Sequence, residues 1–246
     1  MTTLAILTSA GSGVRLGAAV PKALVLLDGV PLVVRAARGL AASGVVDEIV
    51  VTAPADHAEH VRGLLDHLER DDAGTTVPVV VVPGGVTRQA SVAAGLAAAD
   101  PAHDVVLVHD AARPLTPPDL VRRVADAVRA GHGAVVPGVP VTDTVKQVRP
   151  AGEAASVPVQ EVVGTVDRSV LRAVQTPQGF ARDVLERAHA AGAATAHAEG
   201  AAATDDAGLV ERDGGRVVVV EGDEHAMKIT TPRDLRVAEL LLTEDR

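Results

Sequence analysis

The sequence predicts an α/β domain with a mostly parallel, twisted sheet and helices on both faces. Short valine-rich apolar runs alternate with longer segments whose apolar residues recur at helical spacing. The links between them are short, which is typical of repeated β-α-β units. A length of 246 residues fits one large domain, so we expect a single domain over residues 1–246.

The apolar runs that predict strands are nearly continuous, which indicates burial on both faces of the sheet. They are residues 4–8, 47–52, 77–82, 104–109, 133–139, 172–176 and 216–221. Amphipathic periodicity predicts the helices between them, the first of which has a proline in its first turn. They are residues 31–43, 55–70, 88–99, 116–130, 182–192 and 231–242.

Residues 140–169 break this alternation because they have no helical period. They consist of two extended stretches around residues 149–156, which predicts a long hairpin, here called the β-arm (about residues 139–167). An isolated two-stranded hairpin is marginally stable in water, so we expect the β-arm to pack on a second copy of the chain. The alternative is a mobile surface excursion.

Composition excludes several classes of function. A net charge of −9 argues against a general nucleic-acid or anionic-membrane binder. The absence of cysteine excludes disulfides, thiolate metal sites and cysteine nucleophiles. Phe180 is the only aromatic residue, so a nucleobase must be held by backbone and small polar groups rather than by stacking. We find no signal peptide and no apolar run of about 18 residues, and expect a cytoplasmic protein without membrane contact.

A small-residue loop follows the first predicted strand. Gly11 and Gly13 permit close approach of the backbone to a ligand, and Arg15 and Lys22 supply positive charge. Leu16 breaks the dinucleotide pattern G-x-G-x-x-G, and the loop contains no Walker A Gly-Lys-Ser/Thr. The pattern therefore indicates an anion-binding loop of another kind; the alternative is a tight turn with two solvated cations.

Further polar residues and glycines lie just past other predicted strands or at strand–helix and loop–helix junctions. The first group is Gly84, Gly85, Arg88, Ser91, Asp110 and Arg113, and the second is Thr204 and Lys228. Because the carboxyl ends of parallel strands meet at one edge of a sheet, we expect these groups to line one cleft. For Asp110 and Arg113 the alternative is a local ion pair of little energetic value.

Other catalytic patterns are absent from the sequence. His57, His60 and His67 recur along one predicted helix, but no H-E-x-x-H pattern accompanies them, and we interpret them as a solvated helix face rather than metal ligands. The G-x-S-x-G elbow of serine hydrolases does not occur in the sequence, so serine hydrolase chemistry is not indicated. We predict no metal-ligating residue.

The ordered segments AGSGVRLG, PKAL, VHDAARP, PVTDTVK, TVDR, TPQGF, TDDAG and KIT resemble those of the 2-C-methyl-D-erythritol 4-phosphate cytidylyltransferase family of the non-mevalonate isoprenoid pathway. The resemblance spans nearly the whole chain. It implies a Rossmann-like nucleotidyltransferase fold, a homodimer formed through the β-arm, and transfer of a cytidylyl group from CTP to methylerythritol phosphate with release of pyrophosphate. It also implies Mg²⁺ bound mainly through the CTP phosphates. We expect no appended cyclase domain.

The resemblance also implies roles for individual residues. The catalytic cations are Arg15, Lys22 and Lys228. The nucleotide-binding residues are Ser9, Ala10, Gly11, Gly13, Gly85, Arg88, Ser91, Asp110 and Ala111. The acceptor-binding residues are Asp110, Arg113 and Thr204, with Thr144 and Arg168 supplied by the partner's β-arm.

The expected chemistry needs no general base. A phosphate monoester has a second pKa of about 6 and is already mostly ionised at neutral pH. Catalysis then consists of positioning and charge stabilisation for in-line attack at the α-phosphorus. Three alternatives remain open: a cytidylyltransferase for another polyol phosphate such as ribitol 5-phosphate, a regulatory nucleotide-binding module without chemistry, and a sugar-phosphate nucleotidyltransferase.

Overall fold

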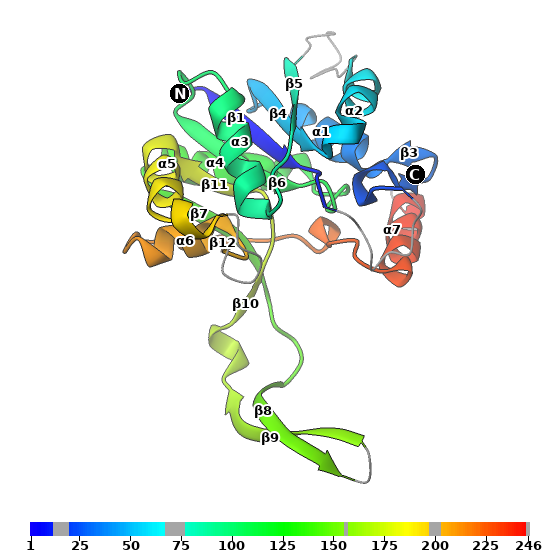
Figure 1. Ribbon diagram of the computed structural model, residues 1–246, viewed down its shortest axis with the longest axis vertical. Coiled ribbons are helices and arrows are strands. Elements are labelled where there is room, and N and C mark those ends of the chain that lie inside the picture. The colour runs from blue at the N-terminus through cyan, green and yellow to red at the C-terminus, as the bar shows by residue number, and fades with distance from the viewer. Residues whose placement is uncertain (12–19, 67–76, 155–156, 197–202, 245–246) are drawn as a thin grey trace.

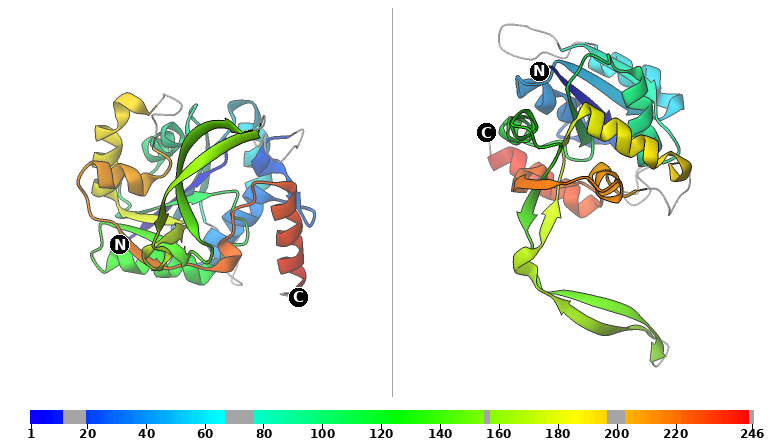
Figure 2. Two further views of the ribbon diagram at one scale, coloured as in Figure 1. Left: turned by 90° about the horizontal axis from the view of Figure 1, so that it is seen from below. Right: turned by 90° about the vertical axis from the view of Figure 1, so that its left-hand side faces the viewer.

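A central sheet carries helices on both faces, and a two-stranded arm projects from it in the computed structural model (Figures 1 and 2). The structure describes residues 1–11, 20–66, 77–154, 157–196 and 203–244. The sheet has eight strands, with the order β10-β7-β11-β6-β1-β4-β5 and β12 paired to β7. The predicted α/β architecture is confirmed.

Four parallel strands form one half of the sheet. They are β1 (Thr3–Thr8), β4 (Glu48–Ala53), β5 (Val79–Pro83) and β6 (Val105–Asp110). The runs of Val, Ile and Leu in β1, β4 and β6 are almost wholly buried, as expected for strands covered on both faces, whereas β5 lies at the edge of the sheet and only its Val81 is buried. The register pairs Thr8 with Asp110, so β1 and β6 end level with each other. The loops that follow these strands therefore begin at the same edge of the sheet.

The other half of the sheet is mixed. β11 (Gln178–Ala181) lies between β6 and β7 (Ala134–Pro140) and is antiparallel to both. β10 (Arg172–Val174) pairs antiparallel with β7, and β12 (Val218–Glu221) pairs parallel with it. The sequence interpretation missed β11, because in this four-residue strand only Phe180 is a large apolar residue.

Two apolar cores cover the faces of the sheet. On one face lie α1 (Leu32–Ala42), α2 (Ala58–Leu65) and α4 (Pro118–Arg129). On the other lie α3 (Arg88–Ala98), α5 (Arg182–Ala191) and α6 (Asp206–Arg212). Only α6 was not predicted as a helix. Short 3₁₀ turns complete the chain: η2 (Lys22–Leu24), η3 (Ala55–His57), η4 (Arg168–Val170), η5 (Ala193–Thr195) and η6 (Glu224–Ala226).

A third, smaller core joins segments from the two ends of the chain. The hairpin of β2 (Leu26–Leu27) and β3 (Val30–Pro31) packs against α7 (Pro232–Glu244). Its buried members are Leu27, Leu32, Ile229 and Ala238. Val25, directly after η2, packs on this core, and Ile229, directly after Lys228, is a member of it, so Lys22 and Lys228 are carried on segments that meet there.

The β-arm is a hairpin separate from the main sheet. β8 (Val145–Ala154) pairs antiparallel with β9 (Val157–Val166) and with no strand of the main sheet among the described residues. In Figures 1 and 2 it extends well away from the main body. The predicted long hairpin is confirmed. In the described part of the chain no helix has the length and apolar character needed to cross a bilayer.

Candidate functional site

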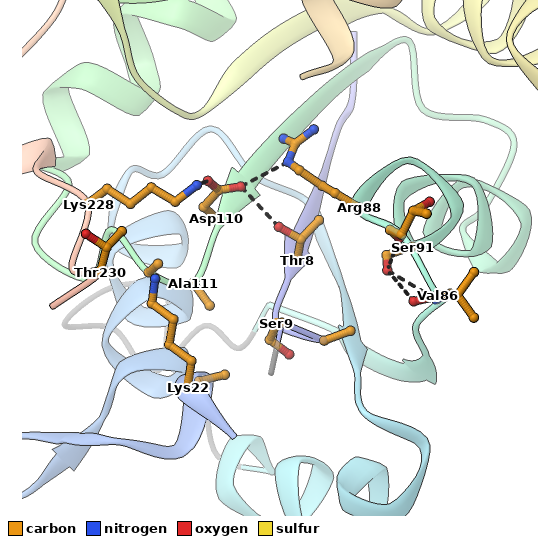
Figure 3. A pocket seen from close by; sticks show the side chains of 16 residues that line it. Thr8, Ser9, Lys22, Val86, Arg88, Ser91, Asp110, Ala111, Lys228 and Thr230 are labelled. Atoms are coloured by element: carbon orange, nitrogen blue, oxygen red, sulfur yellow. Dashed lines mark hydrogen bonds and ion pairs between the residues drawn. The ribbon is translucent and has the colours of Figure 1, made fainter. Parts of the chain in front are cut away.

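A pocket of about 610 Å³ opens at the edge of the sheet where β1 and β6 end (Figure 3). It collects residues from segments that are far apart in the sequence, as expected for the carboxyl edge of parallel strands. Many of the predicted site residues line it: Ser9, Ala10, Gly11, Lys22, Gly85, Arg88, Ser91, Asp110, Ala111 and Lys228. The expectation of one common cleft is confirmed for these residues.

Two other predicted residues, Gly13 and Arg15, lie outside the described residues. Arg113 is described and does not line this pocket. Arg113 donates from Nη1 to the carbonyl of Ala226 at 2.6 Å and from Nη2 to that of Val174 at 3.3 Å. Arg113 therefore braces two neighbouring loops. Its guanidinium makes no close ion-pair contact with Asp110, although its charge still acts on that carboxylate.

The remaining predicted acceptor residues lie on exposed surface. Thr204 is exposed just before α6. Thr144 and Arg168 flank the two strands of the β-arm, and Arg168 donates to the carbonyl of Thr142. Within one chain, none of these three residues lines the pocket.

The carboxylate of Asp110 binds two cations in the pocket. Its Oδ2 lies 2.7 Å from Lys228 Nζ, while its Oδ1 accepts from Arg88 Nε and Thr8 Oγ1, each at 3.2 Å (Figure 3). Burial alone would raise the pKa of Asp110, but the neighbouring charges of Arg88 and Lys228 outweigh it and hold the pKa well below its usual range. Asp110 is therefore an ionised carboxylate that fixes two cations.

A buried chain of hydrogen bonds holds the backbone at Asp110. The Asp110 N–H donates to Thr176 Oγ1 at 3.1 Å, and Thr176 Oγ1 lies 3.0 Å from His109 Nδ1. The Arg113 carbonyl can only accept, so His109 Nε2–H donates to it at 3.3 Å, and Nδ1 of the neutral ring accepts from the Thr176 hydroxyl. His109 is thus neutral, and burial lowers its pKa to about 4.

Two glycines make the turn that forms another wall of the pocket. The Gly84 N–H donates to the Ala53 carbonyl at 2.7 Å, and a Cβ on Gly85 would lie 2.4 Å from that of Ala90. Ser91 Oγ accepts from the Gly85 N–H at 3.1 Å and donates to the Thr87 carbonyl at 2.9 Å. The Ser91 hydroxyl therefore shapes the turn, and the backbone of the turn faces the pocket.

Ser9 has a similar structural role on the opposite side. It is buried, and its Oγ donates to the carbonyl of Thr52 at 2.8 Å, as does its backbone N–H at 2.9 Å. These bonds extend the pairing of β1 with β4 by one residue. The chain leaves the sheet only after Ser9, which brings Ala10 and Gly11 to the pocket.

The two described lysines of the predicted catalytic set converge on the pocket. In Figure 3 the side chains of Lys22 and Lys228 extend into the same space from different segments. Lys228 is held from behind, since Ile229 next to it is buried and its N–H donates to the Ala112 carbonyl at 2.8 Å. The described lining thus contains the cations Lys22, Arg88 and Lys228, of which Arg88 and Lys228 contact the carboxylate of Asp110.

The donor groups of the pocket do not form a metal cage. No cluster of three or more His, Cys, Asp or Glu residues suited to a metal exists among the described residues. The oxygens of Asp110 are bound to Arg88, Thr8 and Lys228. His57 Nδ1 lies 3.0 Å from Asp56 Oδ1, and His67 of the predicted histidine face lies outside the described residues.

Sequence reasoning missed Thr8, which lines the pocket, and several residues behind the lining. Thr8 lies within a predicted strand and carried no other signal; His109 also lies in a strand, but within the motif VHDAARP. Thr176 binds Asp110, which lies 66 residues away in the sequence, and Asp206 binds Arg88, which lies 118 residues away. Only the motifs that contain them, TPQGF and TDDAG, carried a signal.

Known proteins resemble this chain over nearly its whole length. The family model of 2-C-methyl-D-erythritol 4-phosphate cytidylyltransferase matches residues 3–244. The enzyme of that name from Streptomyces avermitilis is 51% identical over 99% of this chain and 93% of its own length. The one from Streptomyces coelicolor is 53% identical over 99% of this chain and 86% of its own length.

Solved structures agree with this match. The 2-C-methyl-D-erythritol 4-phosphate cytidylyltransferase of Thermus thermophilus is 37% identical, with a TM-score of 0.71 over 99% of this chain and 100% of that one. The 4-diphosphocytidyl-2C-methyl-D-erythritol synthase of Anaerococcus prevotii is 27% identical, with a TM-score of 0.79 over 98% of both chains. The chain therefore belongs to the 2-C-methyl-D-erythritol 4-phosphate cytidylyltransferase family, and it is an enzyme of the nucleotidyltransferase class.

Proposed function

We propose that this chain transfers a cytidylyl group from CTP to 2-C-methyl-D-erythritol 4-phosphate and releases pyrophosphate. The observation that carries the proposal is the convergence of Lys22 and Lys228 with the glycine turn in one pocket of a chain that belongs to this family. The products are 4-diphosphocytidyl-2-C-methyl-D-erythritol and pyrophosphate.

The reaction brings two anions together. The acceptor phosphate is mostly ionised at neutral pH and attacks the α-phosphorus in line with the departing pyrophosphate. Lys22 and Lys228 reduce the repulsion and stabilise the charge that develops on the α-phosphate oxygens. The new bond joins the acceptor oxygen to the α-phosphorus, and the bond to the bridging oxygen of the β-phosphate breaks. No side chain has to remove a proton.

Asp110 keeps the site from being uniformly cationic. Its carboxylate holds Lys228 at 2.7 Å, and an ionised carboxylate also accepts hydrogen bonds from sugar hydroxyls. We assign it to the junction between nucleotide sugar and acceptor. The cations of the lining outnumber this single carboxylate, which favours a bound triphosphate.

The glycine turn suits recognition of cytosine. Ala10 and Gly85 line the pocket and have only main-chain groups to offer to a base, and Ser91 holds the turn in place by binding the Gly85 N–H. Cytosine differs from uracil in the donor and acceptor pattern of its Watson–Crick edge, so fixed backbone groups distinguish the two bases. No aromatic platform is required.

The acceptor phosphate is assigned to a second copy of the chain. Thr144 and Arg168 do not line the pocket of their own chain, and the β-arm that carries them projects away from the body. Valines of the arm are exposed, among them Val157 (59%), Val162 (54%) and Val163 (47%). Burying these side chains in a homodimer would stabilise the hairpin and deliver both residues to the partner's site.

Mg²⁺ is expected to arrive with the nucleotide. It keeps several waters and binds few protein ligands beside substrate phosphates. Because the pocket's carboxylate oxygens are bound to Arg88, Thr8 and Lys228, the lining does not fit a resident Mg²⁺ site. We assign no catalytic step to the ion beyond its presence in the CTP complex.

A pyrophosphate-release screen tests the proposal. CTP, UTP, ATP and GTP are each mixed with methylerythritol phosphate or ribitol 5-phosphate. We expect release with CTP and methylerythritol phosphate above every other pair. Equal use of the four nucleotides would contradict the cytosine pocket. Preference for ribitol 5-phosphate would show that the acceptor is another polyol phosphate. Absence of release with every pair would favour a nucleotide-binding module without catalytic activity.

A further inference from the structure

A second buried carboxylate lies behind the pocket. Asp206 is the first residue of α6, is fully buried, and does not line the pocket. Its Oδ1 lies 2.9 Å from His189 Nε2, and its Oδ2 accepts from Arg88 Nη1. Burial alone would raise the pKa of Asp206, but the charge of Arg88 and the bond to His189 lower it. Asp206 therefore places a fixed negative charge behind Arg88.

Arg88 is shared between two carboxylates. Its Nη1 binds Asp206 and its Nε binds Asp110. Arg88 is the first residue of α3, where the positive end of the helix dipole disfavours a cation and no acidic residue lies in the first turn. The two carboxylates compensate for this placement. They also fix the orientation of the guanidinium, so that Nε is the nitrogen directed at Asp110.

This orientation determines which oxygen of Asp110 is available. Arg88 and Thr8 bind Oδ1, and Oδ2 is bound to Lys228. A guanidinium without a second carboxylate tends to bind both oxygens of one carboxylate as a fork. Without Asp206, the fork of Arg88 would compete with Lys228 for Oδ2.

We propose that Asp206 is a positioning residue: by holding one end of the Arg88 guanidinium, it reserves Oδ2 of Asp110 for Lys228 and so sets the place of the Lys228 ammonium in the pocket. The proposal deepens the proposed function and rests on it for the role of Lys228. Asp206 itself touches neither reactant. Its effect passes through Arg88 and Asp110.

A double-mutant cycle between Asp206 and Lys228 tests the coupling. Asp206→Asn keeps the shape of the side chain and an acceptor oxygen while it removes the charge. We expect kcat to fall about 30-fold in the single variant, but less than about 3-fold further when Lys228→Ala is already present. A purely structural role would instead multiply the two losses, and that outcome overturns the proposal.

The neighbouring carboxylate gives a matched control. Asp205 caps α6 by accepting from the Gly208 N–H and also binds Gln178, but it makes no contact with Arg88. Asp205→Asn removes one negative charge at the same helix end and retains a good capping residue. We expect kcat to change less than about 3-fold. An equal loss in Asp205→Asn and Asp206→Asn would mean that charge at the helix end, and not the contact with Arg88, is what matters.

Chemical labelling tests the geometry without turnover. Lys22, Lys146 and Lys228 are the lysines of this sequence, and acetic anhydride followed by mass spectrometry reports the reaction rate of each. In Asp206→Asn we expect Lys228 to react several-fold faster relative to Lys146 on the β-arm. The reason is that Arg88 then binds Oδ2 of Asp110, and this oxygen no longer holds the Lys228 ammonium. An unchanged Lys228 rate overturns the proposal.

The two hypotheses fail in different ways. If the wild-type chain releases no pyrophosphate from CTP, the proposed function fails, while the labelling result still decides whether Asp206 positions Lys228. Circular dichroism in the far ultraviolet verifies folding of each variant. If Asp206→Asn does not fold, Asp206→Ser, a smaller neutral residue suited to the first turn of a helix, gives the same two readouts.

Discussion

Lys228 Nζ lies 2.7 Å from Asp110 Oδ2, although Asp110 ends β6 and Lys228 follows η6 near the other end of the chain. The carboxylate holds the ammonium at the edge of the sheet, where a nucleotide phosphate would meet it. The contact is partly exposed, since 42% of the Lys228 side chain is accessible. An ammonium so placed remains available to a ligand while its position is fixed.

Removing either lysine should abolish most of the activity. We expect Lys22→Ala and Lys228→Ala each to lower kcat/KM by at least about 100-fold, since one preorganised donor contributes about 3 kcal/mol to the barrier. Arg38→Ala, at an exposed position on α1, removes the same charge away from the pocket and should leave the rate unchanged. Pyrophosphate release measures the rate, and thermal unfolding verifies the fold. Near-normal turnover in either lysine variant would refute its role.

Ser91 should affect CTP affinity more than the rate of the chemical step. Ser91→Ala removes the hydroxyl that binds the Gly85 N–H and the Thr87 carbonyl, and we expect KM for CTP to rise about 10-fold, the value of one or two hydrogen bonds. Ser43→Ala is the matched control, because its buried hydroxyl also donates to a carbonyl, that of Leu40. The control should lower stability without changing KM. A KM for CTP in Ser91→Ala equal to wild type would argue against the turn as the base site.

Stability should depend on His109 below neutral pH. Its folded pKa of about 4 lies below the unfolded value of 6.5, so between these values only the unfolded chain binds the proton. The stabilisation is complete above pH 6.5 and is lost as the pH falls toward 4. From pH 7 to pH 4.5 we expect the wild type to lose about 2 kcal/mol more than His109→Gln, measured by urea unfolding.

The control for this prediction is another histidine. His60 is exposed on α2, so His60→Gln should follow the wild-type pH dependence. Parallel curves for wild type and His109→Gln would contradict a neutral, buried His109.

The β-arm should determine the oligomeric state. We expect a solution mass of twice 25.0 kDa for the full chain and the mass of a monomer when residues 141–165 are deleted. Val162→Asp should shift the chain toward the monomer by burying a charge in the interface, whereas Leu240→Asp, on the exposed surface of α7, should not. Light scattering gives the masses. A monomeric full chain would show that the arm does not serve as the dimer contact.

Divalent ions should be needed for turnover and not for folding. EDTA should stop pyrophosphate release, and added Mg²⁺ should restore it, because the triphosphate carries the ion. Mg²⁺ alone should leave Tm unchanged, whereas a resident ion would raise it by mass action. A rise in Tm with Mg²⁺ in the absence of CTP would reveal a protein metal site.

The sequence predicted those parts of the fold that depend on local pattern. β1, β4 and β6 appear as apolar runs, and α4 appears as a strongly amphipathic segment. β11 was missed because its burial comes from strands on both sides and not from its own composition. The helix α6 was missed because its seven residues are too few to show a period.

In the site, too, only the features that depend on local sequence pattern could be predicted. Glycines and lysines after strands could be predicted, because topology brings strand ends to one edge. The bonds of Thr176 to Asp110 and of Asp206 to Arg88 depend on packing between segments 66 and 118 residues apart, which no local pattern encodes. Arg113 illustrates the same limit: its proximity to Asp110 in sequence suggested a pair, yet its guanidinium binds the Ala226 and Val174 carbonyls.

The solitary aromatic ring of this protein has a practical consequence. Phe180 is fully buried between β6 and β7, and the chain contains neither tryptophan nor tyrosine. The folded protein is therefore almost transparent at 280 nm and has no intrinsic indole or phenol emission. The absorption and circular dichroism of a bound cytosine would consequently be measured with almost no contribution from the protein near 280 nm. One tryptophan introduced near the pocket would be the sole source of indole fluorescence and would report nucleotide binding.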